Sequence, residues 1–526
     1  MNRLDRRSLL KMAAPAAAAA TATKIRAASS QPNVLFVMTD QQRFDTIAAL
    51  GNSTIYTPNI DRLVNRGVAF TNAYSSCPVC VPARYTIRTG CEPHTTCIFQ
   101  NSPPRLLEGQ PRVMTARTGG PYIAQTMQSL GYRTFGIGKF HTQPWNEPLG
   151  YDVHLHGEEL YGTPQQRRGD AFASWIAEKH PEYDYIETLM GERTEMYYMP
   201  QMRPQPAHCA MEGWASAQAC EQIGVNDSRP FFGFVSFVGP HPPIAPPLPF
   251  NRLYDPDRMP NPVRGNIEVD HMDEQIPFMN YTIWADDIND GHARVIRARY
   301  YGTITYIDDC IGRILDAVEK RGDAENTVIC FFTDHGDHLG DHSAWQKESF
   351  FDVSCRVPFL VSWPAKLAAG KRCEQLTALT DLFGIATKAA GKPQFRQGFD
   401  ALGVVDGSAQ PREHLFGYYG EPGTPLFKIM VRSGDWKYIF LANGGREQLF
   451  NLKDDPHELT NAMSSSPAVA SRLRAVAEKE CSRPELAGAM KAFPFQARPH
   501  KRTYQFDRSR GVTGFPARPQ DVLKRT

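Results

Sequence analysis

The chain has 526 residues, of which 41% are hydrophobic and 22% are charged, so its composition is that of a globular protein and excludes a chain that is disordered throughout. Its length exceeds that of a usual single core and predicts two domains, or one large domain with an appendage. Without residues 1–30, which carry six basic residues and one acidic residue, 52 basic and 55 acidic residues remain, and this near-neutral balance argues against nucleic acid as a partner.

The first 30 residues are predicted to lie outside the fold. Arg6 and Arg7, followed by Ser-Leu-Leu-Lys, precede an Ala-rich and weakly hydrophobic stretch, which is typical of a twin-arginine export signal. The alternative is a disordered or helical N-terminal arm. Such a signal predicts a bacterial protein that the twin-arginine machinery exports, already folded, to the periplasm or the medium. No run of about 18 strongly apolar residues occurs, so we do not expect an integral membrane protein.

Four continuous apolar runs predict buried β-strands. They are NVLFVM (33–38), RTFGIG (133–138), FFGFVSFV (231–238) and TVICFFT (327–333). Helical patterns lie between them, the clearest over residues 298–320, where apolar residues recur with a period close to 3.6. Strands that alternate with helices predict an α/β fold, with a large mixed, mostly parallel sheet sandwiched by helices.

Polar or chargeable residues follow each of these strands. They are Asp40, Lys139, His241, Asp334 and His335. One Asp after one strand is more often a helix cap or a turn former, but four strands that end in this way favour a site. Because ligands bind beyond the carboxyl ends of the strands in open α/β sheets, we expect these side chains to converge if the strands share a sheet.

The character of the sequence changes after about residue 365. Residues 414–452 contain four short apolar runs separated by turns, which predict a smaller antiparallel sheet. We therefore expect a main domain over 31–395, a small α+β subdomain over 396–496 and a basic tail over 497–526. The tail is expected to lie on the surface as a solvated strap; the alternative is that it lines the site entrance and attracts an anionic substrate.

The stretch SSCPVCVPARYTIRTG (75–90) contains Cys77 and Cys80, a spacing that suggests a redox pair or half of a zinc site. No second pair of cysteines or histidines occurs at the spacing of a zinc ribbon or finger. Pro82 is suited to the first turn of a helix, which would place Cys80 at a helix N-terminus, where anions are favoured. Arg84 would then lie on the same helix face, an arrangement suited to a tetrahedral oxyanion.

The pattern Cys-x-Pro-x-Arg-x-x-x-x-Thr-Gly over residues 80–90 resembles the signature of the type I sulfatases of the alkaline phosphatase superfamily. The resemblance extends over most of the chain. Segments with counterparts in the family are NVLFVMTDQQRFD (33–45), GKFH (138–141), GPHPP (239–243), TDHGDHLGDHSAWQK (333–347), RVPFLV (356–361) and LFNLKDDPHELTN (449–461). The resemblance implies the α/β fold of that superfamily and a hydrolase that cleaves sulfate esters.

In that family a maturing enzyme oxidises the first cysteine of the motif to formylglycine, and the resemblance places this modification on Cys80. Cys77 has no role in the motif and is expected to be a buried small residue. One hydroxyl of the hydrated aldehyde attacks sulfur and forms a covalent sulfate ester. The other hydroxyl then loses its proton, the carbonyl re-forms and sulfate leaves. A plain serine or cysteine could attack but could not eliminate sulfate in this way.

The resemblance also implies a role for each matched residue. Arg84 would hold the modified residue, and His241 would donate a proton to the leaving alcohol. The ligands of a divalent metal would be Asp40, Gln41, Asp334 and His335, with modified Cys80 completing the shell. Sulfate oxygens or formylglycine hydroxyls would be bound by Lys139, His141 and Lys347.

Gln41 and His335 depart from the commonest pattern of the family, which has Asp and Asn at these positions. Oxygen-rich shells suit Ca²⁺ and imidazole suits softer ions, so Ca²⁺ is expected, while Mn²⁺ or Zn²⁺ stays open. Arg88 stands where an aliphatic residue is usual, either as a surface change or paired with a buried acid. His338 and His342 are interpreted as loop residues outside the metal shell.

The leading hypothesis is hydrolysis of sulfate esters of a carbohydrate or another sulfated small molecule. The alternative enzyme is a phosphonate or phosphate ester hydrolase with the same modified residue. The pair Gln41 and His335 resembles the metal-ligand set of phosphonate monoester hydrolases. A hypothesis of another class is a non-catalytic binder of sulfated glycans, which needs no modification of Cys80. Trp145 is expected either to stack on a sugar ring or to pack within the protein.

Overall fold

The structure is a computed structural model that describes residues 31–104, 106, 110–158, 164–184, 197–270, 272–283, 285 and 288–497. The predicted export signal and the basic tail beyond residue 497 lie outside this part of the chain. Among the described residues, no helix is both long and apolar enough to cross a membrane.

Eight strands form the main sheet. They are β1 (Asn33–Thr39), β2 (Val68–Phe70), β4 (Arg133–Gly138), β5 (Val153–His156), β6 (Phe231–Ser236), β7 (Thr327–Thr333), β8 (Phe359–Ser362) and β9 (Lys371–Cys373), in the spatial order β5-β4-β6-β1-β7-β8-β2-β9. The four strands predicted from the sequence, β4, β6, β1 and β7, are consecutive neighbours and run parallel. β8 is antiparallel to β7 and to β2. The prediction of a mixed, mostly parallel sheet is confirmed.

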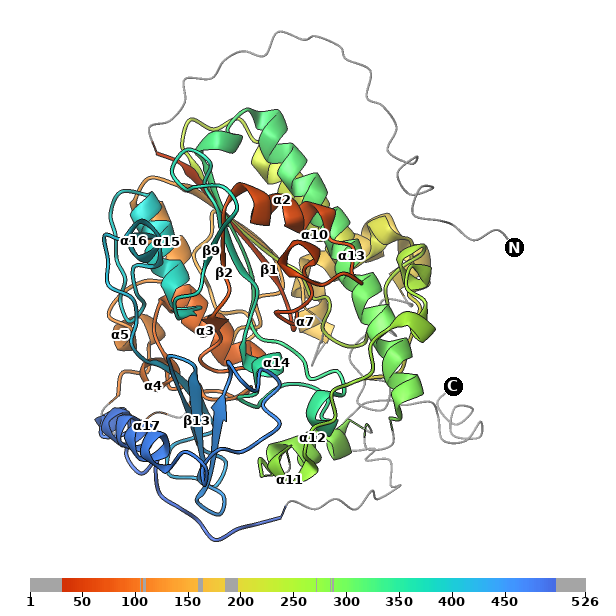
Figure 1. Ribbon diagram of the computed structural model, residues 1–526. Helices are drawn as coiled ribbons and strands as arrows, with labels where there is room; N and C mark the ends of the chain where they lie inside the picture. Colours follow the sequence, from red (N-terminus) through yellow and green to blue (C-terminus); the bar gives the residue numbers. More distant parts are fainter. Residues whose placement is uncertain are drawn as a thin grey trace. The chain divides into compact units, whose positions relative to one another are not determined.

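Helices cover both faces of this sheet (Figure 1). The residues of β1 are buried throughout, because alternate side chains of a strand pack against helices on opposite faces. Leu35 and Val37 pack on the face covered by α2 (Pro58–Arg66), α8 (Ala171–Lys179), α10 (Met211–Gly224) and α13 (Asp290–Arg321). Phe36 packs on the face covered by α3 (Cys80–Thr89), α6 (Ile123–Ser129), α15 (Asp381–Ala389) and α16 (Ala401–Asp406).

The helix predicted over 298–320 is longer in the structure, because α13 begins at Asp290. The side chain of Asn289 accepts a hydrogen bond from the backbone N–H of His292 at the start of the helix, and Gly322 ends it in the left-handed conformation. Ala293 and Ile296 in the first two turns are buried and extend the apolar stripe of the helix towards its N-terminus.

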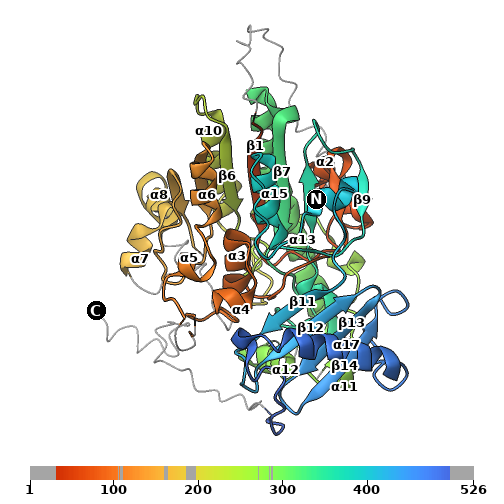
Figure 2. The same ribbon diagram turned by 90° about the vertical axis from the view of Figure 1, so that its left-hand side faces the viewer.

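The smaller antiparallel sheet is also present, and α17 packs against it (Figure 2). It consists of β11 (Leu415–Tyr419), β12 (Lys428–Ser433), β13 (Trp436–Leu441) and β14 (Arg446–Asn451), and α17 spans Pro467–Glu480. Lys437 joins this sheet to the part of the chain that carries the main sheet, since its ammonium group lies 2.5 Å from Asp352. The same ammonium lies 2.7 Å from Glu458, which follows β14.

The remaining elements are short. β3 (Ala73–Tyr74) pairs in parallel with β10 (Thr377–Ala378). The other helices are α4 (Pro93–Thr96), α5 (Met114–Arg117), α7 (Pro164–Gly169), α11 (Ile267–Asp270), α12 (Gln275–Thr282) and α14 (Asp352–Cys355). The helix α3 begins at Cys80, after a short connection from the end of β3 at Tyr74, at the edge where the parallel strands end.

Candidate active site

The register of the central strands places their following residues side by side. Thr39 of β1 pairs with Thr333 of β7, so Asp40 and Asp334 leave the sheet at the same level. Lys139 follows the last residue of β4 and donates its backbone N–H to the carbonyl of Ser236, 3.0 Å away at the end of β6. The shared carboxyl edge therefore collects these side chains, as the sequence predicted.

Arg84, one turn into α3, is the buried centre of this edge. Its Nε lies 3.0 Å from Asp334 Oδ2 and its NH2 2.8 Å from Asp40 Oδ2, while its NH1 donates to the carbonyl of Lys139 and to Ser236 Oγ. Burial opposes the charge of the guanidinium, but the two carboxylates outweigh it and raise its pKa above the ordinary value. Arg84 thus fixes one oxygen of each carboxylate.

The other oxygen of each carboxylate is turned towards a common point. Asp40 Oδ1 and Asp334 Oδ1 lie 3.8 Å and 3.7 Å from His335 Nε2. Cys80 Sγ is 3.2 Å from the same imidazole nitrogen and 3.8 Å from Asp40 Oδ1. These four fully buried donors lie within 4.8 Å of one another, which is the spacing that a single cation could bridge.

Gln41 adds an amide to this group. Its φ of 64° turns the chain after β1, and its backbone N–H donates to Asp334 Oδ1 at 3.1 Å. The side-chain Nε2 donates to Asp337 Oδ2 at 2.6 Å, which leaves the amide oxygen facing Lys347 Nζ at 2.7 Å. Since the ammonium of Lys347 is also 3.2 Å from Cys80 Sγ, the amide oxygen of Gln41 faces the centre of the site.

This donor set fits one divalent cation. Two carboxylate oxygens, one amide oxygen and one imidazole nitrogen would hold it, from Asp40, Asp334, Gln41 and His335, with residue 80 beside them. Oxygen ligands suit Ca²⁺ and Mn²⁺, and the imidazole also suits Zn²⁺. Bound there, the cation would supply Lewis acidity and positive charge next to the nucleophile.

Cys77 and Cys80 have opposite electrostatic environments. Burial raises the pKa of the Cys80 thiol, but Lys347, Lys139 and His335 outweigh it and bring that pKa well below its ordinary value. Burial raises the pKa of Cys77 well above its ordinary value, and its thiol lies 3.5 Å from the carbonyl of Phe99. Cys77 is a buried thiol, and the helix α3 begins at Cys80.

Lys139 and His141 of the GKFH segment are each anchored by a carboxylate. Lys139 Nζ lies 2.7 Å from Asp40 Oδ2. His141 has a φ of 50°, and its backbone N–H donates to Glu158 Oε1 at 2.5 Å. Burial raises the pKa of Glu158, but its hydrogen bond with His156 and nearby positive groups lower it to about 2. An ionised Glu158 therefore anchors the backbone that presents His141.

His241 follows β6 and is buried. Its Nδ1 lies 2.6 Å from the carbonyl of Pro242, so Nδ1 carries a proton and donates it. Its Nε2 lies 3.1 Å from the hydroxyl of Tyr197. This arrangement orients the ring so that Nε2 is the nitrogen that could exchange a proton with a substrate.

Several residues that complete the site were missed from the sequence. Tyr198 donates to Asp337, and Asp337 in turn accepts from Gln41, so the two orient the amide. Glu158 lies two residues after the end of β5. An acidic residue just after a strand is a sequence signal that could have identified it. Tyr197 and Tyr198 follow a region without a recognisable motif, and nothing in the sequence places them here.

Arg88 differs from both readings of the sequence. It is 5% exposed, so it is not a surface residue, and its guanidinium contacts the carbonyl of Phe140 and the ring of Tyr85, 4.6 Å away, in place of a carboxylate. Trp145 stacks on His156 with 4.8 Å between ring centroids, which is a packing role.

His338 and His342, which follow β7, form hydrogen bonds away from the metal-ligating group around Cys80. His338 Nε2 lies 2.7 Å from Ser349 Oγ, and His342 Nδ1 lies 2.7 Å from Asp270 Oδ1. Neither belongs to the group of four donors around Cys80. The eleven cysteines, all of which lie in the described part of the chain, are free thiols.

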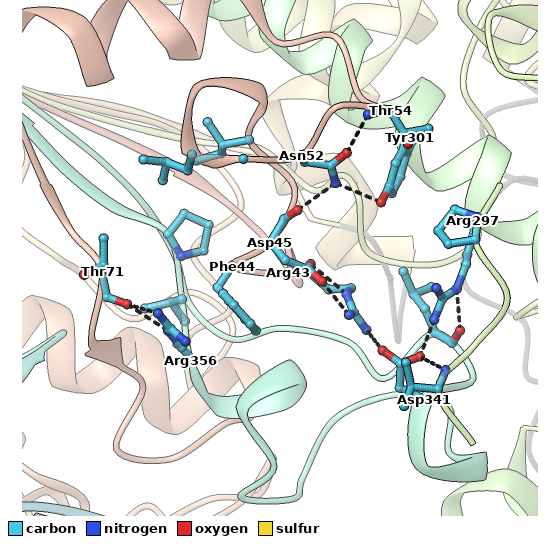
Figure 3. Close-up of a pocket in the computed structure, with 18 of the residues that line it drawn as sticks. Arg43, Phe44, Asp45, Asn52, Thr54, Thr71, Arg297, Tyr301, Asp341 and Arg356 are labelled. Carbon is cyan, nitrogen blue, oxygen red and sulfur yellow. Dashed lines mark hydrogen bonds and ion pairs between the residues drawn. The ribbon is translucent and has the colours of Figure 1, made fainter. Parts of the chain in front are cut away.

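A cavity of about 550 Å³ lies beside the loop that follows Gln41 (Figure 3). Arg43 on this loop lies 2.8 Å from Asp341 and donates to the carbonyls of Asp337 and His338. Arg297 approaches the same Asp341 carboxylate from α13, at 2.5 Å. These charged groups pair with one another and stabilise the loop that follows Gln41. The residues that line the cavity include none of the four metal-ligating side chains around Cys80.

Comparison with known proteins gives consistent matches over most of the chain. The sequence model of the family described as Sulfatase matches residues 32–392. A second model, described as N-sulphoglucosamine sulphohydrolase, C-terminal, matches residues 340–480.

Individual relatives show the same similarity. The chain is 28% identical to an arylsulfatase from Clostridium perfringens, over 83% of this chain and 91% of that protein. It is 27% identical to a choline-sulfatase from Rhizobium meliloti, over 82% of each. The crystal structure of a phosphonate monoester hydrolase of Agrobacterium radiobacter superposes with a TM-score of 0.70 and 25% identity, over 86% of this chain and 95% of that one.

Proposed function

The chain belongs to the sulfatase family, and from this premise we propose that it hydrolyses sulfate esters of a carbohydrate, using formylglycine formed from Cys80 and one bound divalent cation. Inorganic sulfate is the product released. The cation is expected to be Ca²⁺. Mn²⁺ and Zn²⁺ are the alternatives, since oxygen ligands also suit Mn²⁺ and the imidazole of His335 suits Zn²⁺.

One observation carries the proposal. Asp40 Oδ1, Asp334 Oδ1, His335 Nε2 and Cys80 Sγ converge within 4.8 Å at a buried point, and the ammonium of Lys347 lies 3.2 Å from the same sulfur. A packing role does not require two carboxylates, an imidazole, a thiol and an ammonium at one buried place, because burying charges costs free energy unless they are paired.

The surrounding side chains have distinct tasks in this reaction. The hydrated formylglycine at position 80 supplies the nucleophilic hydroxyl and, by re-forming its carbonyl, the route by which sulfate departs. Arg84 keeps the carboxylates of Asp40 and Asp334 in place beside it. His241 delivers a proton to the leaving alcohol oxygen.

The positive groups stabilise the sulfuryl group during transfer. They are Lys139, His141 and Lys347. Burial raises the pKa of the Cys80 thiol, but the charges of Lys347, Lys139 and His335 and a hydrogen bond with His141 outweigh it and bring that pKa well below its ordinary value. Preorganised cations at the place where charge develops lower the barrier without reorganisation of solvent.

The substrate class rests on the C-terminal match. The model that matches residues 340–480 is named for a protein that acts on N-sulphoglucosamine, and a sulfated sugar is therefore the substrate we propose.

A phosphonate or phosphate ester hydrolase is the second candidate. The similarity to the phosphonate monoester hydrolase favours it, as does the pair Gln41 and His335. The combination of Lys139, His141, His241 and Lys347 around one centre favours sulfate esters. A non-catalytic binder of sulfated glycans is a weaker candidate, because it would need neither the modification nor the cation.

The test uses the purified full chain, with conversion of Cys80 verified by peptide mass, since Cys to formylglycine loses about 18 Da by its chemistry. Matched aryl sulfate, phosphate and phosphonate esters are compared with sulfated mono- and oligosaccharides. Sulfate release that exceeds phosphonate turnover and disappears in Cys80→Ala is expected. Absence of sulfate release from every substrate would sink the proposal, and an unconverted Cys80 in the native host would favour the binder.

We also propose that a maturing enzyme converts Cys80 before the twin-arginine machinery exports the protein to the periplasm or the medium. The sequence around Arg6 and Arg7 supports this. Replacing both by Lys should retain the protein in the cytoplasm, as fractionation and immunoblotting would show; unchanged export would contradict the proposal.

A further inference from the structure

A second group of metal-ligating side chains lies outside the candidate active site. His180, His208 and Cys209 each direct one ligand atom so that the three atoms lie within 4.8 Å of one another. None of them belongs to the four-donor group at Cys80, so this cluster needs an explanation of its own.

Two backbone segments build the cluster: His180 lies at the end of α8, and His208 and Cys209 are neighbours in a short 3₁₀ helix. His180 directly follows α8, and its backbone N–H donates to the carbonyl of Ile176 at 2.8 Å. Trp175 packs against its ring at 4.7 Å between centroids. Cys209 ends the short 3₁₀ helix η4 (Ala207–Cys209), directly before α10. The side chains are therefore fixed by regular structure and by packing.

The side chains of the cluster differ in their exposure to solvent. Cys209 is fully buried within the core against the sheet, whereas His208 is exposed. Burial, with a smaller effect of Glu182, raises the pKa of the Cys209 thiol, and the thiol has no hydrogen-bond partner among the described residues. An ion entering from the exposed histidine side would reach a thiol that has no competing partner.

A carboxylate stands next to the cluster. Glu182 Oε1, in η2 (Pro181–Tyr183), lies 3.6 Å from His180 Nδ1, and 59% of its side chain is exposed. An exposed side chain can rotate at little cost, so this oxygen can approach an ion held by the other three groups.

We propose that His180, His208 and Cys209 bind one Zn²⁺, with Glu182 as the fourth ligand. Two imidazoles, a thiolate and a carboxylate form the nitrogen and sulfur-rich tetrahedral set that Zn²⁺ prefers. Binding displaces the thiol proton of Cys209 to solvent, and it involves no redox change.

The position of the cluster gives the ion a structural task. In the sequence, Tyr197 and Tyr198 lie between the two sides of the cluster, His180 on one side and His208 with Cys209 on the other. These tyrosines contact His241 and Gln41 in the active site. An ion that joins the two sides fixes both ends of the segment that carries the tyrosines.

The test measures metal binding directly, in the full-length Cys80→Ala protein, so that the active-site thiol does not contribute. After removal of metal with a chelator, Co²⁺ is added as a spectroscopic substitute for Zn²⁺. A thiolate-to-cobalt absorption band is expected, and it should vanish in the further variant Cys209→Ser. Cys220→Ser removes another partly exposed thiol outside the cluster and should retain the band.

Stoichiometry gives an independent readout. Elemental analysis measures the Zn²⁺ that stays bound after dialysis, and in His208→Ala it should fall by the one equivalent per chain that the cluster binds. If some Zn²⁺ still binds there, its affinity for the cluster should be more than about tenfold lower. His208 is exposed, so the fold is retained. A cobalt band that persists in Cys209→Ser, or a zinc content and a zinc affinity that are both the same in His208→Ala and its parent, would overturn the proposal.

Discussion

Arg84 and Arg88 lie one turn apart on α3 and donate to successive carbonyl groups of one loop. Arg84 NH1 lies 2.5 Å from the carbonyl oxygen of Lys139, and Arg88 donates to the carbonyl of Phe140. The same loop presents the side chains of Lys139 and His141 to the nucleophile. The two guanidinium groups therefore join α3 to the loop that carries Lys139 and His141.

Replacing Arg88 by Leu is expected to lower kcat about tenfold or more, with a smaller change in KM. The carbonyl of Phe140 would lose a charge-assisted donor, a loss worth about 1–3 kcal/mol, and the loop bearing Lys139 and His141 would shift where alignment matters most. Steady-state kinetics on the converted enzyme would measure this. Arg88→Lys keeps a charged donor and should restore part of kcat; equal kcat in the Leu variant and the wild type would refute a positioning role.

Cys77→Ser should retain activity, whereas Cys80→Ser should lose turnover. Cys77 is a buried thiol with a raised pKa and no contact with the donor group, and Ser fills nearly the same volume. Ser at position 80 could attack sulfur once but could not expel sulfate through a carbonyl. Peptide mass and multiple-turnover assays on both variants provide the measurement, and the reverse pattern of activities would overturn the assignment of the nucleophile.

Much of the sheet and of its reactive edge could be predicted from the sequence. β1, β4, β6 and β7 are continuous apolar runs because helices cover both of their faces, and such runs are recognisable in isolation. Asp40, Asp334 and Lys139 could be placed together because parallel strands in one sheet end at the same edge. The family resemblance added Gln41 and Lys347, which no strand pattern indicates.

The rest depends on contacts between distant parts of the chain. Tyr198 reaches Asp337 across 139 sequence positions and Gln41 across 157, and no local pattern encodes either hydrogen bond. From the sequence, Arg88 is interpreted either as a surface residue or as the partner of a buried acid, because helix position alone does not reveal that a loop 52 residues later covers it. Tertiary packing decides both cases.

His335→Asn is expected to shift metal preference towards Ca²⁺. The structure turns His335 Nε2 into the centre of the donor group, and an imidazole favours softer ions, whereas an amide oxygen favours Ca²⁺. The ratio of the Zn²⁺ and Ca²⁺ dissociation constants, measured by competition after chelation, should change at least about tenfold in favour of Ca²⁺. Removing all metal should abolish activity in both proteins, and an unchanged ratio would show that residue 335 is not a ligand.

Glu92 provides a prediction about stability away from the nucleophile. Burial raises the pKa of its carboxyl group to about 7. Its Oε1 accepts a hydrogen bond from the hydroxyl of Thr380 at 3.3 Å. Arg412 lowers this pKa only in part, and its guanidinium is already paired with Asp381 at 2.7 Å. The native protein therefore holds a proton on Glu92 that the unfolded chain, with a pKa near 4.5, releases.

The sign of the pH dependence follows from this difference. Between pH 4.5 and about 7 the native state binds more protons than the unfolded state, so stability falls as pH rises through this window. Glu92→Gln keeps a neutral side chain and should remove that fall, gaining up to about 3 kcal/mol over the wild type at pH 8 relative to pH 4. Urea unfolding of both proteins at pH 4, 6 and 8 measures the difference. A gap between the two proteins that stays constant with pH would mean that Glu92 ionises in the folded protein as easily as in the unfolded chain.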